Sequence, residues 1–163
     1  MATGKITVKK TESVLEQIER MRDRIMDRAY HISRSNGSQP GGDVEHWLKA
    51  ERELVWKPSI ELFETKDAYE AKIALPGIDP GDFRIEVNRN ALLVTGEISH
   101  EHEEENGNVI VCEFEQGKLF REVIFPRQID PDSIKTDLKN GILRVKATIA
   151  AVPKRRKAKA GTS

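Results

Sequence analysis

The stretch that decides the fold is residues 138–149, Leu-Lys-Asn-Gly-Ile-Leu-Arg-Val-Lys-Ala-Thr-Ile. After Asn140-Gly141, apolar side chains alternate with polar ones as far as Ile149, which is the period of a strand with one buried face. Asn-Gly is the dipeptide that two-residue hairpin turns favour most. These residues therefore predict a tight turn between two antiparallel strands, the second of them half-buried.

The same period of two occurs in earlier segments, so the hairpin belongs to a larger β structure. Residues 69–75 and 83–87 alternate in this way, and turn-forming residues such as Pro76-Gly77 and Pro80-Gly81 separate the segments. About eight short segments at this spacing, with no helical pattern between them, indicate an antiparallel sandwich. We therefore expect a mainly β fold, an immunoglobulin-like antiparallel β-sandwich over residues 56–149.

The region before the sandwich has a helical pattern. Apolar residues recur at steps of three and four through residues 11–32, with charged residues on the other face, which predicts an amphipathic helix. Gly, Ser, Asn and Pro crowd residues 33–42, and Asp43 is placed to cap a second helix over residues 43–55. Residues 1–55 are thus expected to form a helical N-terminal region.

Two helices joined by a loop also raise the possibility of a DNA-binding helix-turn-helix. The connection at residues 33–42 is much longer than the ~3 to 4 residues typical of that motif. The second helix would also bring Glu45, Glu51 and Glu53 toward phosphate groups, which is unfavourable. We therefore expect no specific nucleic-acid partner.

Composition limits the remaining possibilities. The chain has 163 residues, of which 33% are charged, and no apolar run approaches the ~20 residues of a membrane helix. Its first residues lack the apolar stretch of a signal peptide, so we expect a cytoplasmic protein with no membrane span. Basic residues concentrate in residues 154–159, which favours a disordered, solubilising tail over residues 150–163. Contact of this tail with nucleic acid or anionic lipid is the alternative.

The residues give little support for catalysis or metal binding. Cys112 is the only cysteine, and we expect it to be a small apolar residue within a strand. His100 and His102 lie among glutamates in what is expected to be a solvated loop, and no phosphate-binding Gly-Lys-Ser/Thr loop is present. The sequence therefore predicts no enzyme, no metal site and no cofactor.

Five motifs in a fixed order resemble a known family. They are Trp-Lys-Pro-Ser-Ile-Glu-Leu-Phe-Glu at 56–64, Ala-Lys-Ile-Ala-Leu-Pro-Gly-Ile at 71–78, Leu-Leu-Val-Thr-Gly-Glu at 92–97, Gly-Lys-Leu-Phe-Arg-Glu-Val-Ile-Phe-Pro at 117–126 and Leu-Lys-Asn-Gly-Ile-Leu-Arg-Val at 138–145. Together they resemble the α-crystallin domain of the small heat shock proteins. Residues 47–54 also resemble a short bacterial domain of unknown function, so a bacterial chain is expected.

This resemblance implies an ATP-independent holdase, a chaperone that captures unfolding client proteins and prevents their aggregation. Such proteins are usually homodimers built into larger homo-oligomers. The alternative from another class is a sandwich adaptor of the co-chaperone type, which binds one defined partner. The apolar helix and the long charged loop before residue 109 are expected of a holdase and are not required of an adaptor.

The resemblance also implies a dimer interface. In the bacterial and plant branch of the family, the strand at residues 109–114 crosses to the partner's sheet, which here brings in Val109, Val111 and Phe114. Arg121 lies where the family places an interface arginine, and is expected to pair with a carboxylate of the sister subunit.

Client binding needs apolar surface that is covered or mobile until proteins unfold. The apolar residues of the N-terminal helices fit this need, and methionines adapt to partners of varied shape. The alternative is that these residues only bury against a neighbouring subunit, and the two roles are compatible. The candidate residues are Val14, Ile18, Met21, Ile25, Met26, Trp47 and Leu48.

Members of the family commonly end in an Ile-x-Ile or Ile-x-Val motif that enters a groove on a neighbouring dimer. We place this groove between residues 82–87 and 133–138, lined by Ile85, Val87, Ile134 and Leu138. After Pro153 this chain has only Lys, Arg, Ala, Gly, Thr and Ser. We therefore expect a groove without a ligand from its own chain, and dimers or small assemblies held by N-terminal contacts.

Overall fold

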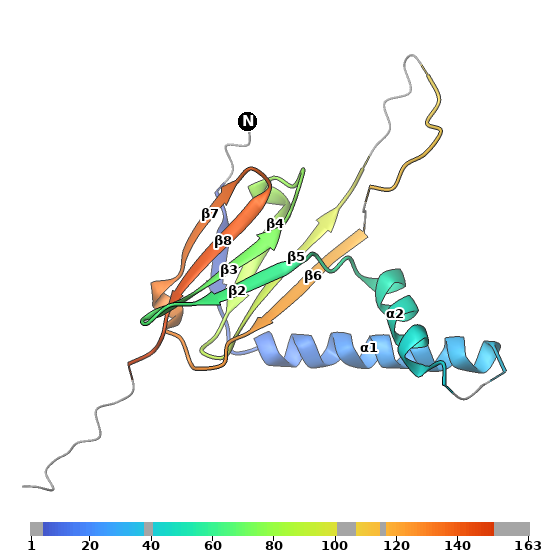
Figure 1. Ribbon diagram of the computed structural model, residues 1–163, viewed down its shortest axis with the longest axis horizontal. Coiled ribbons are helices and arrows are strands. Elements are labelled where there is room, and N and C mark those ends of the chain that lie inside the picture. Colours follow the sequence, from blue (N-terminus) through green and yellow to red (C-terminus); the bar gives the residue numbers. More distant parts are fainter. Residues whose placement is uncertain (1–4, 38–40, 101–106, 115–116, 152–163) are drawn as a thin grey trace, which may run out of the picture.

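The computed structural model describes residues 5–37, 41–100, 107–114 and 117–151, which form two packed β-sheets and two helices (Figure 1). The predicted tail therefore lies, from residue 152 onward, outside the described residues. Two short 3-10 turns, η1 (Pro80–Asp82) and η2 (Pro131–Ser133), join strands. The other elements are β1 (Thr7–Lys10), α1 (Val14–Ser35), α2 (Asp43–Leu54), β2 (Ile60–Glu64), β3 (Ala68–Ala74), β4 (Phe83–Val87), β5 (Ala91–Ile98), β6 (Gly117–Ile124), β7 (Lys135–Lys139) and β8 (Ile142–Thr148).

The strands form two four-stranded sheets. One has the order β1-β4-β5-β6 and the other the order β2-β3-β8-β7. All neighbouring strands are antiparallel except β1 and β4, which are parallel. The prediction of a mainly β sandwich with a helical N-terminal region is confirmed.

The main core lies between the two sheets. Alternate residues of facing strands are buried there, as the period of two requires. Tyr69 on β3 stacks on Phe125 with ring centroids 5.5 Å apart, and the Tyr69 hydroxyl accepts the Arg127 N–H at 3.1 Å. The largest fully buried side chains of this core are Tyr69, Ile73, Leu75, Ile85, Leu92, Leu119, Ile129 and Leu143.

The predicted hairpin joins β7 to β8. Lys139 pairs with Ile142 across the turn, and Asn140 and Gly141 have φ values of 53° and 76°. Two consecutive residues with positive φ are the mark of a type I′ turn, whose twist matches that of the flanking strands. A Cβ on Gly141 would lie 3.1 Å from the Pro76 Cα, so this glycine also lets two loops approach closely.

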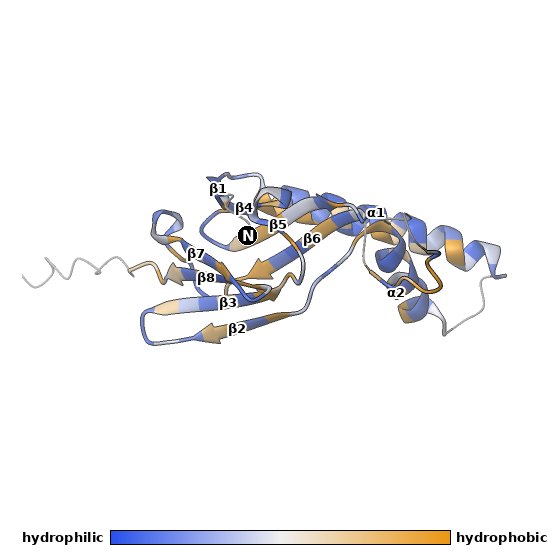
Figure 2. Cartoon of the chain, turned by 90° about the horizontal axis from the view of Figure 1, so that it is seen from above, coloured by the Kyte–Doolittle hydropathy of each residue, from blue (hydrophilic) through white to orange (hydrophobic). Residues whose placement is uncertain are grey.

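The helices pack on each other and on one sheet. Arg28 on α1 forms an ion pair with Glu53 on α2 at 2.7 Å. Viewed from above, α1 lies over β5 and β6, on the side away from the second sheet (Figure 2). The sequence was wrong about the cap of α2, because Gly42 precedes the helix and Asp43 is its first residue. The Asp43 carboxylate still lies in the first turn, where the helix dipole favours negative charge.

Strand β1 was not predicted from the sequence. Its four residues are all exposed, and they pair with β4 in the register Thr7 to Arg84 through Lys10 to Val87. A segment this short and polar gives no recognisable period, so only its pairing with β4 makes it a strand. As a result, the β4 edge of the sandwich is covered by the chain's own N-terminal residues.

Candidate functional site

A second apolar core lies outside the sandwich, between the helices and one face of a sheet. Ala91 and Leu93 of β5 and Phe120 of β6 are buried there, on the face opposite the main core. Because both faces of β5 are covered, its sequence Ala91-Leu92-Leu93-Val94 is continuously apolar. Such a run is typical of a strand buried on both sides, and it could have revealed the covering helix from the sequence.

Helix α1 supplies the other half of this second core. Val14, Ile18, Met21 and Ile25 are between 0% and 7% exposed and face the sheet. The sequence analysis assigned these side chains to clients or to a neighbouring subunit. In the single chain they are instead buried against α2 and against its own β5 and β6, in a cluster that includes Ala50 and Val55.

The remaining candidates on the helices are more accessible. Met26 is 55% exposed and Leu48 is 44% exposed, whereas Trp47 is half-buried at the margin of the second core. The structure therefore divides the predicted set into a covered group on α1 and an exposed group around Met26 and Leu48.

Charged groups frame one margin of the second core. Lys57, which follows α2, lies 3.1 Å from Glu122 on β6 and 3.7 Å from Glu51 on α2. A small cavity of about 110 Å³ lies beside them, with Met21, Ile25 and Phe120 among its lining residues. Contact between α1 and the sheet is thus mainly apolar, with these charges at its rim.

The predicted exchange strand is an exposed segment in the single chain. Residues 107–114 form no strand, and the exposed fractions of Val109, Val111 and Phe114 are 49%, 75% and 73%. Cys112 is also exposed, so the expectation of a cysteine within a strand was wrong for the single chain. The sequence could not show this, because a run of apolar residues gives no information about where its pairing partner lies.

Two further features belong with this segment. Strand β2 is at the edge of its sheet, and its Phe63 is 53% exposed. Arg121 on β6 is half-buried and lies opposite Val94, which places its side chain on the inner face of the sheet. Its Nε is buried and has no hydrogen-bond partner among the described residues.

The predicted groove is covered on its β4 side. Ile85 and Val87 are fully buried in the main core, and Ile134 and Leu138 are half-buried against it. The edge of β4 at which the groove was placed is paired with β1 of the same chain. Ile6-Thr7-Val8 has the Ile-x-Val spacing and lies along β4, with Ile6 packed against the core.

Two surface ion pairs perturb the titration of their members. Hydrogen bonding to Arg127 lowers the pKa of Glu64, which links the end of β2 to the loop after β6 across 2.8 Å. Hydrogen bonding to Asp132 raises the pKa of Lys10, which links β1 to η2. Each pair joins one sheet to an element of the other side of the sandwich.

The described residues are 5–37, 41–100, 107–114 and 117–151. Within them, no three His, Cys, Asp or Glu side chains converge as metal ligands. His102 and its neighbouring glutamates lie outside those ranges. No helix there has the length and apolar character needed to cross a membrane.

Two family models match the chain. Residues 61–160 match the Hsp20/alpha crystallin family, and residues 20–55 match a protein of unknown function (DUF2934). The two matches cover the sandwich and the helical region respectively. The second match includes residues 47–54 and confirms their resemblance to a domain of unknown function.

Named relatives agree with the first match. The chain is 35% identical to "Spore protein SP21" of Stigmatella aurantiaca over 53% of this chain and 51% of that protein. It is 33% identical to "16.9 kDa class I heat shock protein 1" of Triticum aestivum over 70% of this chain and 72% of that protein. The chain thus spans about half the length of one of these relatives and almost three quarters of the other.

Solved structures share the fold. Heat shock protein 16.0 from Schizosaccharomyces pombe superposes with a TM-score of 0.55 and 28% identity, covering 63% of this chain and 73% of that one. A small heat-shock protein from Xylella fastidiosa gives a TM-score of 0.55 with 24% identity, covering 65% and 97%, which supports the fold alone. Because the family model matches residues 61–160, more than half of the chain, and the chain covers 72% of a relative to which it is 33% identical, it belongs to the Hsp20/alpha crystallin family of small heat shock proteins.

Proposed function

We propose that this protein is an ATP-independent holdase of the cytoplasm, a chaperone that captures unfolding proteins and prevents their aggregation. The observation that carries the proposal is the second apolar core, in which the amphipathic helix α1 covers Ala91, Leu93 and Phe120 of the sheet. Family membership supports it, because the small heat shock proteins act as chaperones. Membership gives no comparable support to the adaptor alternative or to an enzyme.

The second core can store apolar surface without unfolding the sandwich. The main core lies between the two sheets and shares no buried residue with the helix-covered face. Opening of α1 would therefore expose apolar side chains on both the helix and the sheet while the sandwich stays folded. Local openings of this kind cost less free energy than global unfolding, so heat populates them first.

The helices also offer surface that needs no opening. Met26 and Leu48 are exposed, and methionine side chains adapt to partners of varied shape. We assign first contact with clients to this exposed pair and firm capture to the covered face. The same side chains can contact other subunits in larger assemblies.

We further propose a homodimer built by strand exchange. Residues 109–114 would pair with the edge strand β2 of a second copy, because both are exposed and both carry apolar side chains. A carboxylate from that copy would pair with Arg121, whose buried Nε has no hydrogen-bond partner among the described residues. Buried charges are stable only when they are paired, which gives this residue a role in dimerisation.

The direct test is light scattering from two unrelated client proteins heated without nucleotide. Scattering should fall when the full chain is present at near-stoichiometric amounts. Two variants are compared with the wild type. Ile18→Asn/Ile25→Asn changes the covered face, and Glu19→Gln/Asp23→Asn is the control because it changes exposed positions of the same helix. No suppression by the wild-type chain, or a requirement for ATP, would show that the assignment is wrong.

A further inference from the structure

Strand β1 places two aliphatic side chains and a cation along one groove. Val8 lies opposite Ile85 and Lys10 opposite Val87, so their side chains point to the same face as these core residues. Ile6, two residues before Val8, packs against the main core. Ile6, Val8 and Lys10 therefore lie on one side of the segment, with Ile6 against the core and Val8 38% exposed at the rim, whereas Thr7 and Lys9 face the other way.

The far side of the groove also holds this strand. Lys10 forms an ion pair with Asp132 in η2, directly before β7, and Asp130 adds a weaker attraction. Ile134 and Leu138 on that side are half-buried against the main core. The strand is thus hydrogen-bonded to β4 in one sheet. Its Lys10 is also ion-paired with the turn that precedes β7, the edge strand of the other sheet.

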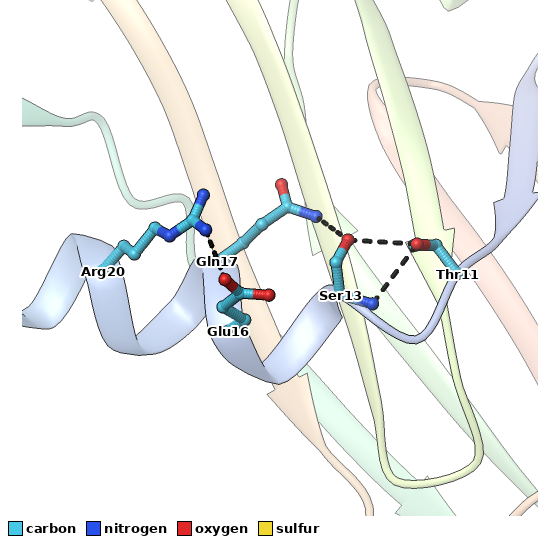
Figure 3. A network of polar contacts seen from close by, with 5 residues as sticks. All are labelled: Thr11, Ser13, Glu16, Gln17 and Arg20. Carbon is cyan, nitrogen blue, oxygen red and sulfur yellow. Dashed lines mark hydrogen bonds and ion pairs between the residues drawn. The ribbon is translucent and has the colours of Figure 1, made fainter.

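Polar contacts join β1 to the start of α1 (Figure 3). The Thr11 N–H donates to the Val87 carbonyl at 3.0 Å, which continues the bonds of β1 along β4. The Thr11 and Ser13 hydroxyls are 3.0 Å apart, and the Gln17 amide donates to Ser13 Oγ at 3.1 Å. The link between strand and helix is therefore ordered by its own side chains.

The first turn of α1 is fastened to the same sheet strand. Gln17 Nε2 donates to a carboxylate oxygen of Glu86 on β4 at 2.6 Å. Glu86 is only 6% exposed, and its carboxylate contacts both Gln17 and, at 3.6 Å, the Arg84 Nε, so docking of α1 supplies one of two partners for this carboxylate. Thus β4 is hydrogen-bonded to β1 along its edge and to the first turn of α1 on its outer face.

From this arrangement we propose that residues 6–10 are a latch that keeps α1 docked on the sheet, so that release of the groove and opening of the helix are one event. This inference rests on the proposed function, because it states what controls exposure of the client-binding face. The latch occupies the groove of its own chain as an extended segment. Its aliphatic residues are Ile6 and Val8, two positions apart, and its cation is Lys10, two positions after Val8.

The coupling follows from the length of the link. Residues 11–13 join Lys10 to Val14 by a link that spans at most about 14 Å when fully extended, so the first turn of α1 cannot move far while β1 stays in place. The latch is also weakly held, because all residues of β1 are exposed and the strand lies at a sheet edge. Its opening is therefore accessible without loss of the main core.

The test is amide hydrogen exchange of the full chain, read by mass spectrometry. Ile6→Asn/Val8→Asn removes the groove-facing side chains, and Thr7→Asn/Lys9→Asn changes the same strand on its other face. The first variant should raise exchange in residues 14–25 by about tenfold, while β3 and β8 stay protected. The second variant should exchange as the wild type does.

If the groove-facing variant exposes β4 but leaves the protection of α1 unchanged, the coupling is wrong. Should that variant fail to fold, the wild-type chain provides a second measurement on heating. Exchange of β1 and of the first turns of α1 should then rise over the same temperature interval, and separate intervals would overturn the inference.

The scattering assay separates this inference from the proposed function. A latch variant with increased exchange in α1 should also suppress client aggregation at lower temperature. Increased exchange without any gain in suppression would leave the latch established and would remove α1 from the client-binding role.

Discussion

Arg121 shows how one residue can be understood only in the context of an assembly. A guanidinium on the inner face of a sheet, with a buried Nε that no described residue satisfies, is costly in an isolated chain. The sequence motif predicted a role at the dimer interface. The buried Nε that lacks a partner among the described residues gives this proposed role a physical basis.

Replacing Arg121 by Met should therefore weaken the dimer. Removal of one partner from a buried charge pair costs about 2–5 kcal/mol of association free energy. Sedimentation equilibrium over a concentration series should show this loss, whereas Arg144→Met, at an exposed position on β8, should dimerise as the wild type does. Unchanged association of the Arg121 variant would mean that its side chain has no partner across the interface.

Gly141 is required by the backbone of the hairpin. Its φ of 76° is unfavourable for residues with a Cβ, and an added Cβ would lie 3.1 Å from the Pro76 Cα. Gly141→Ala should lower the free energy of unfolding by about 1–2 kcal/mol in urea denaturation. Gly81→Ala is the matched control, because nothing lies within 4 Å of its Cβ position. Equal stability of the two variants would contradict the type I′ turn.

Glu64 provides a dependence on pH. Hydrogen bonding to Arg127 lowers its pKa below the ordinary value of 4.5, so its ionised form favours the folded state. The stability advantage of the wild type over Glu64→Gln should be complete above pH 4.5 and should vanish as the pH falls through the lowered pKa. Urea denaturation of both proteins from neutral to acidic pH measures this difference. An advantage that persists at the most acidic pH would contradict the ion pair as its cause.

At the scale of elements, the sequence predicted the parts that carry their own periodicity. The alternation in β3, β4 and β8 and the Asn140-Gly141 turn were sufficient for the sandwich, and the three-four spacing was sufficient for α1. Strand β1 and the docking of α1 were missed, because both depend on contacts between segments distant in sequence. Only the continuous apolar run at residues 91–94 indicated that a further layer covers the sheet. That run could be interpreted in this way only once the other elements had been assigned.

The segment at residues 109–114 is an element whose structure we expect to depend on a second chain. Replacing Val109, Val111 and Phe114 by Ser keeps the length of the loop and removes its apolar side chains. Analytical ultracentrifugation should then show a folded monomer with unchanged β-sheet circular dichroism. Ser99→Ala/Glu113→Gln, which alters polar positions of the same loop, should remain dimeric. A dimer that survives the triple replacement would place the interface on another edge.

The whole molecule combines a sandwich that is self-contained with an N-terminal region that covers it. The main core lies between the two sheets. Strand β1 covers the edge of β4, and α1 covers the outer face of β5 and β6. This division explains how apolar surface can be stored in a folded protein and released without loss of the fold. We propose that clients are captured on the face that α1 covers.

Site-specific photo-crosslinking tests that claim most directly. A photoreactive residue is placed in the full chain at position 25 on α1, which is buried in the second core, at position 26, which is exposed, or at position 135 on β7 as a control. With a client present, we predict that crosslinks at position 25 are absent at ambient temperature and appear on heating, while position 135 stays uncrosslinked. Crosslinks that form on heating at position 135 or only at position 26, with none at position 25, would contradict the account.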